Sequence, residues 1–362
     1  MNEVIFSDSP VFILGAGFSK CAGLPVQAEF SNLIVSDDFL SEIDKEITKS
    51  IKAFLKDVFG WSSGNDIPSL EDIFTSIDLS SGTGHHLGAK YKPNKLRALR
   101  RMLIYRIFKI IDTKYLRSDA ITKLLEHYMV KECSFVVLNW DIVLENHLRY
   151  IFPDINIDYS TDIVNWDSNL LVNPRQTTYI YKMHGSSNWA YCENCKTLYF
   201  QIDSKLPLHK KIGLIKSDFR LFNTKFTNAF FDREINLTHD ERKCKKCNCN
   251  LSSHIATFSF KKSFRTNAYP SIWGSAEKKL AYSKHWIFIG YSLPEADFEI
   301  KHLLKSAELQ MYHKFKHRKI EAVIYKDNNT KAKFEKFFGK DKVTVYNKGL
   351  GKYVKTLNVP PQ

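Results

Sequence analysis

Short apolar segments alternate with helical segments along most of this sequence, and this alternation constrains the fold more than any other feature. Six segments have the length and apolar character of buried strands; they span 11–14, 134–139, 178–184, 285–290, 319–325 and 342–347. Strands that alternate with helices form parallel sheets whose two faces are both covered. The sequence therefore predicts an α/β fold, with a Rossmann-like parallel sheet and helices on both faces.

A long helical region separates the first predicted strand from the second. Its clearest part is 36–59, where serine and aspartate favour a helix N-terminus and apolar residues recur every three or four positions. Segments 69–78, 94–112 and 118–129 are also predicted to be helical. We expect residues 31–130 to form a helical insertion in the sheet domain.

Glycines and polar residues follow four of the predicted strands, in the stretches GAGFS, NWD, HG and GYS. Ligands of parallel sheets bind beyond the carboxyl ends of the strands. These stretches are therefore candidates for one shared site. The residues that the strand ends single out are Gly15, Gly17, Asn139, Asp141, His184, Gly290 and Ser292.

Each of these stretches also has a purely structural interpretation. Gly15 and Gly17 let a phosphate approach the backbone, but a strand-to-helix turn favours glycines too, and Gly23 comes too late for a G-x-G-x-x-G fingerprint. Asn139 suits a helix N-cap, and Asp141 suits the first turn of a helix. A histidine at a strand end is able to act as a general base, but it is more often a hydrogen-bonded structural residue.

Four of the seven cysteines form two C-x-x-C pairs, CENC and CKKC. Each pair supplies two thiolates to a tetrahedral zinc site, and four thiolates predict a closed, structural site. The predicted ligands are Cys192, Cys195, Cys244 and Cys247, and Cys249 competes with the last two. We expect residues 186–255 to form a small zinc-ribbon module.

The composition, 44% hydrophobic and 25% charged, is that of an ordinary globular protein. The predicted sheet domain comprises 1–30, 131–185 and 256–362. We expect a soluble, cytoplasmic protein, because no basic leader opens the sequence and the apolar run at 11–14 is too short to cross a bilayer. Cys21 and Cys133 are expected to be buried small residues.

The net charge of +14 favours anionic partners such as nucleotides or nucleic acid. Lysine and arginine gather at 95–109, 209–216, 241–247 and 313–319. The alternative interpretation is that each run is the solvated face of one helix or loop. The interleaved basic and aromatic residues of a nucleic-acid module are not found, so nucleic acid is the less favoured partner.

In their order along the chain, five motifs resemble those of the sirtuin (silent information regulator) superfamily: GAGFSKCAGLP, NWD, KMHGS, the two C-x-x-C pairs and FIGYSLP. The resemblance extends from Gly15 to about Asp327. It is closer to a bacterial sirtuin-like branch, some members of which consume NAD in antiviral defence, than to protein deacylases. Pro25 is followed by VQAEF instead of the deacylase pattern Pro-x-Phe-Arg, and no Phe-Gly-Glu strand follows the second cysteine pair.

The resemblance implies that NAD lies across the strand ends as a substrate and that Zn²⁺ is structural. The implied nucleotide-binding residues are Gly15, Ala16, Gly17, Ser19 and Gly23 in the pyrophosphate loop, Gly290 and Ser292 near the adenosine, and Asp327 near the adenine ribose. The resemblance also implies three catalytic residues. Asn139 holds the ribose or a water, Asp141 orients the carboxamide, and His184 is the general base. The implied products are nicotinamide and linear or cyclic ADP-ribose.

Two other functions stay open. The same residues suit an NAD-dependent protein deacylase or ADP-ribosyltransferase, and the basic runs suit a non-catalytic module that binds a nucleotide or nucleic acid. NAD is the expected small-molecule partner. A homo-oligomer and a separate activator or sensor protein are also open, whereas a membrane partner is not expected.

Overall fold

The computed structural model describes residues 9–129, 133–165, 176–192, 194–200, 213–227, 230–231, 233, 243–255, 268–310 and 318–357. Within them, seven parallel strands form one sheet, in the order β11-β10-β9-β1-β2-β5-β3. Six of these are the strands expected from the sequence: β1 (Val11–Leu14), β2 (Ser134–Val137), β5 (Gln176–Lys182), β9 (His285–Ile289), β10 (Lys319–Val323) and β11 (Val343–Tyr346). The seventh, β3 (Ile155–Asp158), is not predicted, because INID is short and its alternate residues are only half-buried.

Strand β1 lies in the middle of the sheet and pairs with both β2 and β9. The chain extends the sheet on one side through β2 and β5, and on the other through β9, β10 and β11. These six strands reproduce the 3-2-1-4-5-6 order of dinucleotide-binding folds, with β3 added beside β5. Because the order reverses at β1, the loops after β1, β2 and β9 diverge and leave a crevice at their carboxyl ends.

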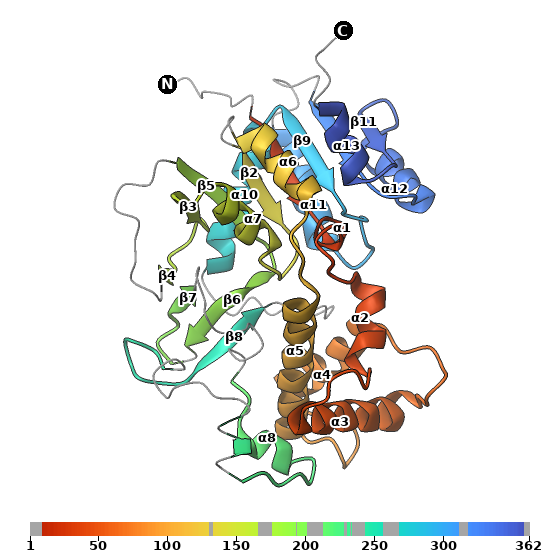
Figure 1. Ribbon diagram of the computed structural model, residues 1–362, viewed down its shortest axis with the longest axis vertical. Coiled ribbons are helices and arrows are strands. Elements are labelled where there is room, and N and C mark those ends of the chain that lie inside the picture. The colour runs from red at the N-terminus through yellow and green to blue at the C-terminus, as the bar shows by residue number, and fades with distance from the viewer. Residues whose placement is uncertain are drawn as a thin grey trace.

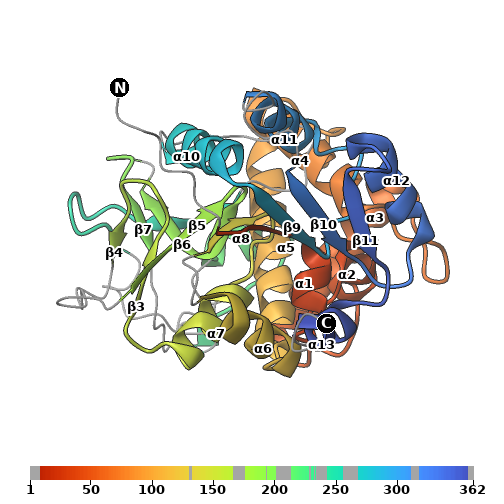
Figure 2. The same cartoon turned by 90° about the horizontal axis from the view of Figure 1, so that it is seen from above.

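Helices cover both faces of the sheet, as expected (Figure 2). One face carries α6 (Asp119–Tyr128), α7 (Val143–Ile151) and α13 (Leu350–Leu357). The other face carries α10 (Ala268–Tyr282), α11 (Phe298–Gln310) and α12 (Asn328–Phe338). The Rossmann-like architecture predicted from the sequence is therefore confirmed.

A group of helices lies beyond the carboxyl ends of the strands, below the sheet in Figure 1. After the short α1 (Ala16–Lys20) it comprises α2 (Gln27–Ile34), α3 (Glu42–Phe59), α4 (Leu70–Thr83) and α5 (Pro93–Lys114). The sequence fixes its boundaries locally: Ser41 and Ser69 accept hydrogen bonds from backbone N–H groups of the first turns of α3 and α4. Helices are present where the sequence predicts them, but α2 begins before residue 31, and α6, which the predicted insertion 31–130 includes, packs against α7 and α13 on the sheet.

The basic run of α5 is not simply a solvated helix face. Arg106 is fully buried and donates to the backbone carbonyl of Asp44 and to Thr48 Oγ1, at 2.7 and 2.8 Å. Arg100 pairs with Asp78, and Arg101 forms a bidentate pair with Asp218 of α8 (Lys216–Arg220). These charges therefore hold the helical group together and join it to α8.

A second sheet of four strands has the order β4-β7-β6-β8. Its members are β4 (Val164–Asn165), β6 (Gly185–Cys192), β7 (Leu198–Phe200) and β8 (Leu251–Ile255). Strand β6 begins directly after the turn that ends β5. The small sheet therefore starts at the carboxyl end of β5. Cys192 is the last residue of β6, Cys195 lies in the turn before β7, and Cys244 and Cys247 lie just before β8, so both cysteine pairs of the predicted module 186–255 belong to this sheet and its turns.

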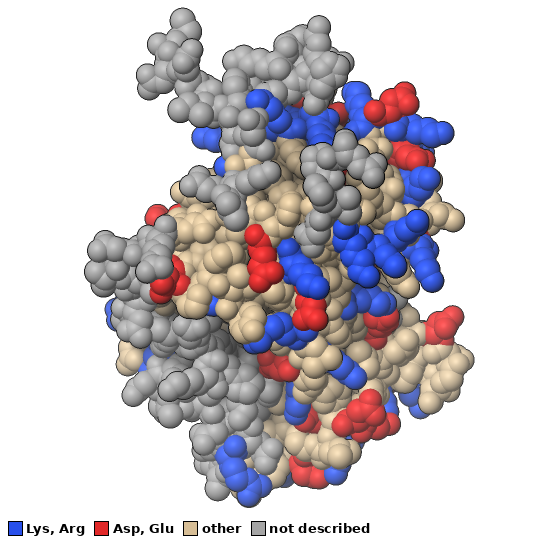
Figure 3. Space-filling model, turned by 45° about the horizontal axis from the view of Figure 1, so that its top comes forward, with Lys and Arg blue, Asp and Glu red and all other residues tan. Residues whose placement is uncertain are grey.

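Exposed lysines gather near the C-terminal end of the described chain. Figure 3 shows this basic area at its upper right, over α12 and α13. Its exposed members include Lys331, Lys336, Lys342 and Lys352. Within the residues that the structure describes, no helix is long and apolar enough to span a bilayer.

Cys133 is buried, as expected, but Cys21 is exposed. The prediction for Cys21 is wrong because this residue is the C-cap of α1, where the helix ends at the surface. Its thiol contacts only the carbonyl of Gly17, at 3.7 Å, among the hydrogen bonds of the described chain.

The buried His147 is expected to make stability depend on pH. Its Nδ1 donates to the Val143 carbonyl at 2.7 Å, and its Nε2 accepts from the Ser118 N–H at 3.0 Å, so the ring is neutral. Burial lowers the pKa of His147. The unfolded chain therefore binds this proton first, and stability falls as the pH drops below about 6.5.

The melting temperature measured between pH 7.5 and 5.5 tests this expectation. His147→Gln keeps an acceptor near Ser118 but does not titrate, so its melting temperature should change less over this range. An equal pH dependence in both proteins would contradict the assignment.

Candidate nucleotide site and zinc centre

The loop after β1 packs directly against the loop after β9. The N–H groups of Gly15 and Gly17 donate to the carbonyls of Ile289 and Gly290, at 3.0 and 2.8 Å. A Cβ atom on Gly15 would lie 2.6 Å from the Gly290 oxygen, and one on Gly17 would lie 2.7 Å from Gly290 Cα. The glycines are therefore needed for contact between two backbones, and two of their N–H groups are already used inside the protein.

Gly290 is the most constrained of these glycines, and Gly290→Ala is expected to destabilise the protein. Its φ is +63°, and an added Cβ would lie 2.2 Å from the Phe18 nitrogen. The left-handed backbone and the overlap together should cost at least about 3 kcal/mol. Gly274→Ala is the matched control, because nothing lies within 4 Å of that Cβ and alanine favours a helix by about 1 kcal/mol.

Urea denaturation of the two variants measures the difference. We expect the midpoint of Gly290→Ala to fall and that of Gly274→Ala to rise or stay unchanged. Similar midpoints in both variants would show that the two loops are not in close contact.

The candidate residues after β2 reach across to the loop after β1. Asn139 Nδ2 donates to the Gly15 carbonyl at 2.8 Å and to Ser19 Oγ at 2.9 Å. Ser19 Oγ in turn donates to Asp141 Oδ2 at 2.8 Å. Two residues after β2 and two after β1 thus form one hydrogen-bonded group of four. Asp141 is 9% exposed, so its carboxylate lies at the edge of the protein interior.

The structural interpretation of this stretch is partly correct. Asp141 Oδ1 accepts the Val143 N–H at 3.1 Å and so supports the start of α7. The N-cap of α7, however, is Ile142, which has no side-chain cap, so Asn139 is not the N-cap. Asn139 is therefore left to hold the two loops together.

His184 lies in the turn between β5 and β6 and is 8% exposed. Its Nδ1 is 3.2 Å from the Leu138 carbonyl. A carbonyl only accepts hydrogen bonds, so Nδ1 carries a proton, which leaves Nε2 as the one ring nitrogen that is able to accept. The N–H groups of Met183 and Ser187 donate to the carbonyls of Val137 and Trp140, which hold the turn beside the end of β2.

These groups surround one pocket whose empty volume, open mouth included, is about 1110 Å³. Most of the predicted site residues line it: Gly15, Ala16, Ser19, Asn139, Asp141, His184, Gly290 and Ser292. These residues come from segments far apart in the sequence, and the order of the strands in the sheet brings them together. The pocket lies where open parallel sheets bind dinucleotides, beyond the carboxyl ends of the strands at the point where the strand order reverses.

Three predicted nucleotide-binding residues do not line the pocket: Gly17, Gly23 and Asp327. Gly17 packs against Gly290. Gly23 has φ +82°, and an added Cβ would lie 2.6 Å from the Lys114 carbonyl, so this glycine lets the chain pass the end of α5. Asp327 is the N-cap of α12 and accepts from the Thr330 N–H at 2.9 Å.

Other residues of the pocket are not predicted from the sequence. The helical group contributes Phe30, Glu71, Ile107 and Ile111 to its wall. Tyr291 and Asp297 follow β9 and also line it, and the Tyr291 hydroxyl donates to Asp297 Oδ2 at 3.2 Å. Tyr291 and Asp297 lie in the stretch GYSLPEAD, which the sequence had already singled out. The four residues of the helical group had no such signal, because helical spacing alone does not reveal which side of α4 or α5 faces a ligand.

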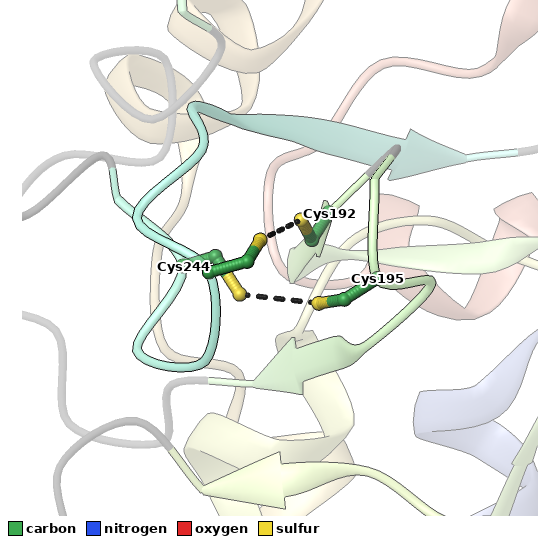
Figure 4. A group of neighbouring side chains, drawn as sticks. Cys192, Cys195 and Cys244 are labelled. Carbon is green, nitrogen blue, oxygen red and sulfur yellow. Dashed lines mark hydrogen bonds between the residues drawn. The ribbon is translucent and has the colours of Figure 1, made fainter.

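The two cysteine pairs come together in the second sheet. Sulfur atoms of Cys195 and Cys244 are 3.3 Å apart, and those of Cys192 and Cys247 are 3.4 Å apart. All four sulfur atoms lie within 4.8 Å of one another. Figure 4 shows Cys192, Cys195 and Cys244 pointing toward a common centre. Cys249 is not in the group, so the competition among the predicted ligands is resolved in favour of Cys244 and Cys247.

This group fits a zinc ion. Zinc–sulfur bonds of about 2.3 Å in a tetrahedron place the sulfur atoms about 3.8 Å apart, close to the spacing found here. The two turns also have the same form: Lys196 and Asn248 follow their cysteine pairs with φ of 62° and 57°. Their N–H groups donate to the carbonyls of Cys192 and Cys244, both at 2.9 Å. None of the four cysteines lines the candidate pocket at the strand ends, so the ion would be structural.

No protein-family model matches this sequence, and no curated protein matches it. Solved sirtuin structures are similar to it. A structure on sirtuin substrate affinity has a TM-score of 0.43 and 13% identity, over 97% of this chain and 93% of its own. A structure on the mechanism and regulation of Sir2 enzymes has a TM-score of 0.44 and 12% identity, over 97% of this chain and 90% of its own. A complex of a Sir2 homologue with NAD has a TM-score of 0.41 and 13% identity, over 97% of this chain and 88% of its own.

Proposed function

We propose that this protein cleaves the bond between nicotinamide and ribose in NAD, releasing nicotinamide and ADP-ribose. One observation carries the proposal: Asn139, Asp141 and His184 line a single pocket at the point where the strand order reverses. The resemblance of GAGFS, NWD and KMHGS to sirtuin motifs supports the same substrate.

The chemistry needs a charge-stabilising pocket and a base. Breaking the glycosidic bond develops positive charge on the ribose, which fixed polar groups stabilise. Asp141, held by Ser19 and by the Val143 N–H, is proposed to orient the nicotinamide carboxamide. Asn139 is proposed to hold the ribose or the attacking water. His184, with its proton on Nδ1, is proposed to accept a proton through Nε2, either from water or from a ribose hydroxyl.

The wall built by the helical group favours water over a peptide as the acceptor. Phe30, Glu71, Ile107 and Ile111 close one side of the pocket. The sequence also lacks the deacylase patterns after Pro25 and after the second cysteine pair. We therefore favour hydrolysis of NAD over protein deacylation as the activity. We also propose a role in bacterial antiviral defence, in which self-assembly or a separate protein activates the enzyme.

A cleavage assay tests the proposal. Purified protein is incubated with NAD, with and without an acyl-lysine peptide and with candidate activators, and nicotinamide is measured by chromatography. Release without peptide supports hydrolysis, and release only with peptide supports the deacylase. Equal silence of the wild type and His184→Ala under every condition would reject both.

A further inference from the structure

A fully buried lysine lies beneath the candidate catalytic loop. Lys182 is the last residue of β5, and its side chain has no exposed surface. Its ammonium contacts three acceptors: the carbonyl of Asp141, the carbonyl of Asn139 at 3.5 Å, and Glu145 Oε1 at 3.1 Å. An ammonium has three donors, so these acceptors match its full capacity.

Stability alone is a weak reason to bury this charge. Removing an ammonium from water costs several kcal/mol, and apolar residues of the same size often stabilise a protein as well as a buried ion pair does. Two of the three N–H groups of the Lys182 ammonium donate to the backbone carbonyls of residues 139 and 141. Those carbonyls belong to the residues whose side chains line the pocket.

The loop 139–141 is thus held from two sides. On the pocket side, the Asn139 and Asp141 side chains bond to Gly15 and Ser19. On the interior side, Lys182 binds the backbone. Lys182 does not line the pocket, so it has no access to a ligand there.

Glu145 completes the arrangement from the first turn of α7. Its Oε1 also accepts the Tyr159 hydroxyl at 3.3 Å, and Tyr159 accepts from Asn188 Nδ2 at 3.2 Å. The counter-charge of Lys182 is therefore itself anchored to β6 and to the segment after β3. Because the Glu145 carboxylate is held in place, it holds the Lys182 ammonium in one position. A mobile carboxylate would not do so.

We propose that Lys182 is a positioning residue, which fixes the backbone of Asn139 and Asp141 so that their side chains meet the scissile bond of the substrate. This role rests on the proposed NAD cleavage. A displacement of about 1 Å in such groups is able to cost a factor of about 100 in rate, so the ammonium should affect turnover more than binding.

The test uses Lys182→Met and the double variant Lys182→Met/Glu145→Leu. The single variant leaves Glu145 without its partner, but the double variant removes both charges and should fold. We expect kcat for nicotinamide release to fall at least ~10-fold in both. The Kd for ADP, which lacks both the nicotinamide and the ribose that Asp141 and Asn139 are proposed to hold, should stay within ~3-fold of wild type.

Glu321→Gln is the matched control. Glu321 is a buried carboxylate of β10 that pairs with His285 and Lys319, at 2.8 and 2.9 Å, and it does not line the pocket. Its replacement should lower the melting temperature without changing kcat. A purely structural Lys182 would behave in the same way.

The outcomes separate the two proposals. If the wild type cleaves NAD and the folded double variant does so at the same kcat, the role of Lys182 is rejected and the proposed function stands. If the wild type neither cleaves NAD nor binds ADP, the proposed function fails and the positioning role fails with it. A lower kcat with an unchanged Kd supports both.

Discussion

Replacing His184 by glutamine is expected to lower the rate of nicotinamide release by at least ~100-fold, the usual contribution of a general base. Glutamine is polar and of similar length, so the turn between β5 and β6 should keep its shape. It has no ring nitrogen to accept a proton. Nicotinamide release measured by chromatography gives the rate.

Binding and folding must be unchanged for this result to have meaning. The Kd for ADP-ribose, measured by calorimetry, should stay within ~3-fold of wild type. His147→Gln is the matched control, because His147 is also buried but does not line the pocket. A His184→Gln protein with wild-type turnover would remove His184 from the mechanism.

Removing one zinc ligand is expected to have the second large effect. Cys244→Ser should release the ion and unfold the turns that carry the two cysteine pairs, because structural zinc contributes about 10 kcal/mol or more to folding of small modules. The melting temperature should fall clearly. Cys249→Ser should bind zinc as the wild type does, since Cys249 lies outside the four-sulfur group.

Elemental analysis and thermal melting measure these effects. We expect one zinc ion per chain in the wild type and in Cys249→Ser, and less in Cys244→Ser. If Cys249→Ser loses the ion and Cys244→Ser keeps it, the assignment of the fourth ligand is wrong. If no protein holds zinc, the site is not a metal centre.

The catalytic candidates were predictable because they follow a rule that is local in sequence. Asn139, Asp141 and His184 come directly after apolar strands, and the carboxyl ends of parallel strands lie at one edge of a sheet. Gly23 and Asp327 were assigned by resemblance. In the structure, Gly23 passes the end of α5 and Asp327 caps α12, roles that depend on neighbours far away in the sequence.

The wall of the pocket was not predictable in the same way. Glu71 of α4 and Ile107 of α5 meet the strand ends only after the helical group has folded against the sheet. Helical spacing indicates which residues share a face, but not what that face contacts. The same limit hid Lys182, which the sequence placed only as one residue inside the predicted strand 178–184.

The sequence by itself determined the features that depend on short spacing: parallel strands alternating with helices, glycines and polar residues at the strand ends, and two C-x-x-C pairs. Only the tertiary structure decided which thiols form the zinc group, which helices close the pocket, and that Lys182 holds the backbone of Asn139 and Asp141. These contacts join segments far apart in the chain, so they arise from packing and burial, which no local pattern encodes.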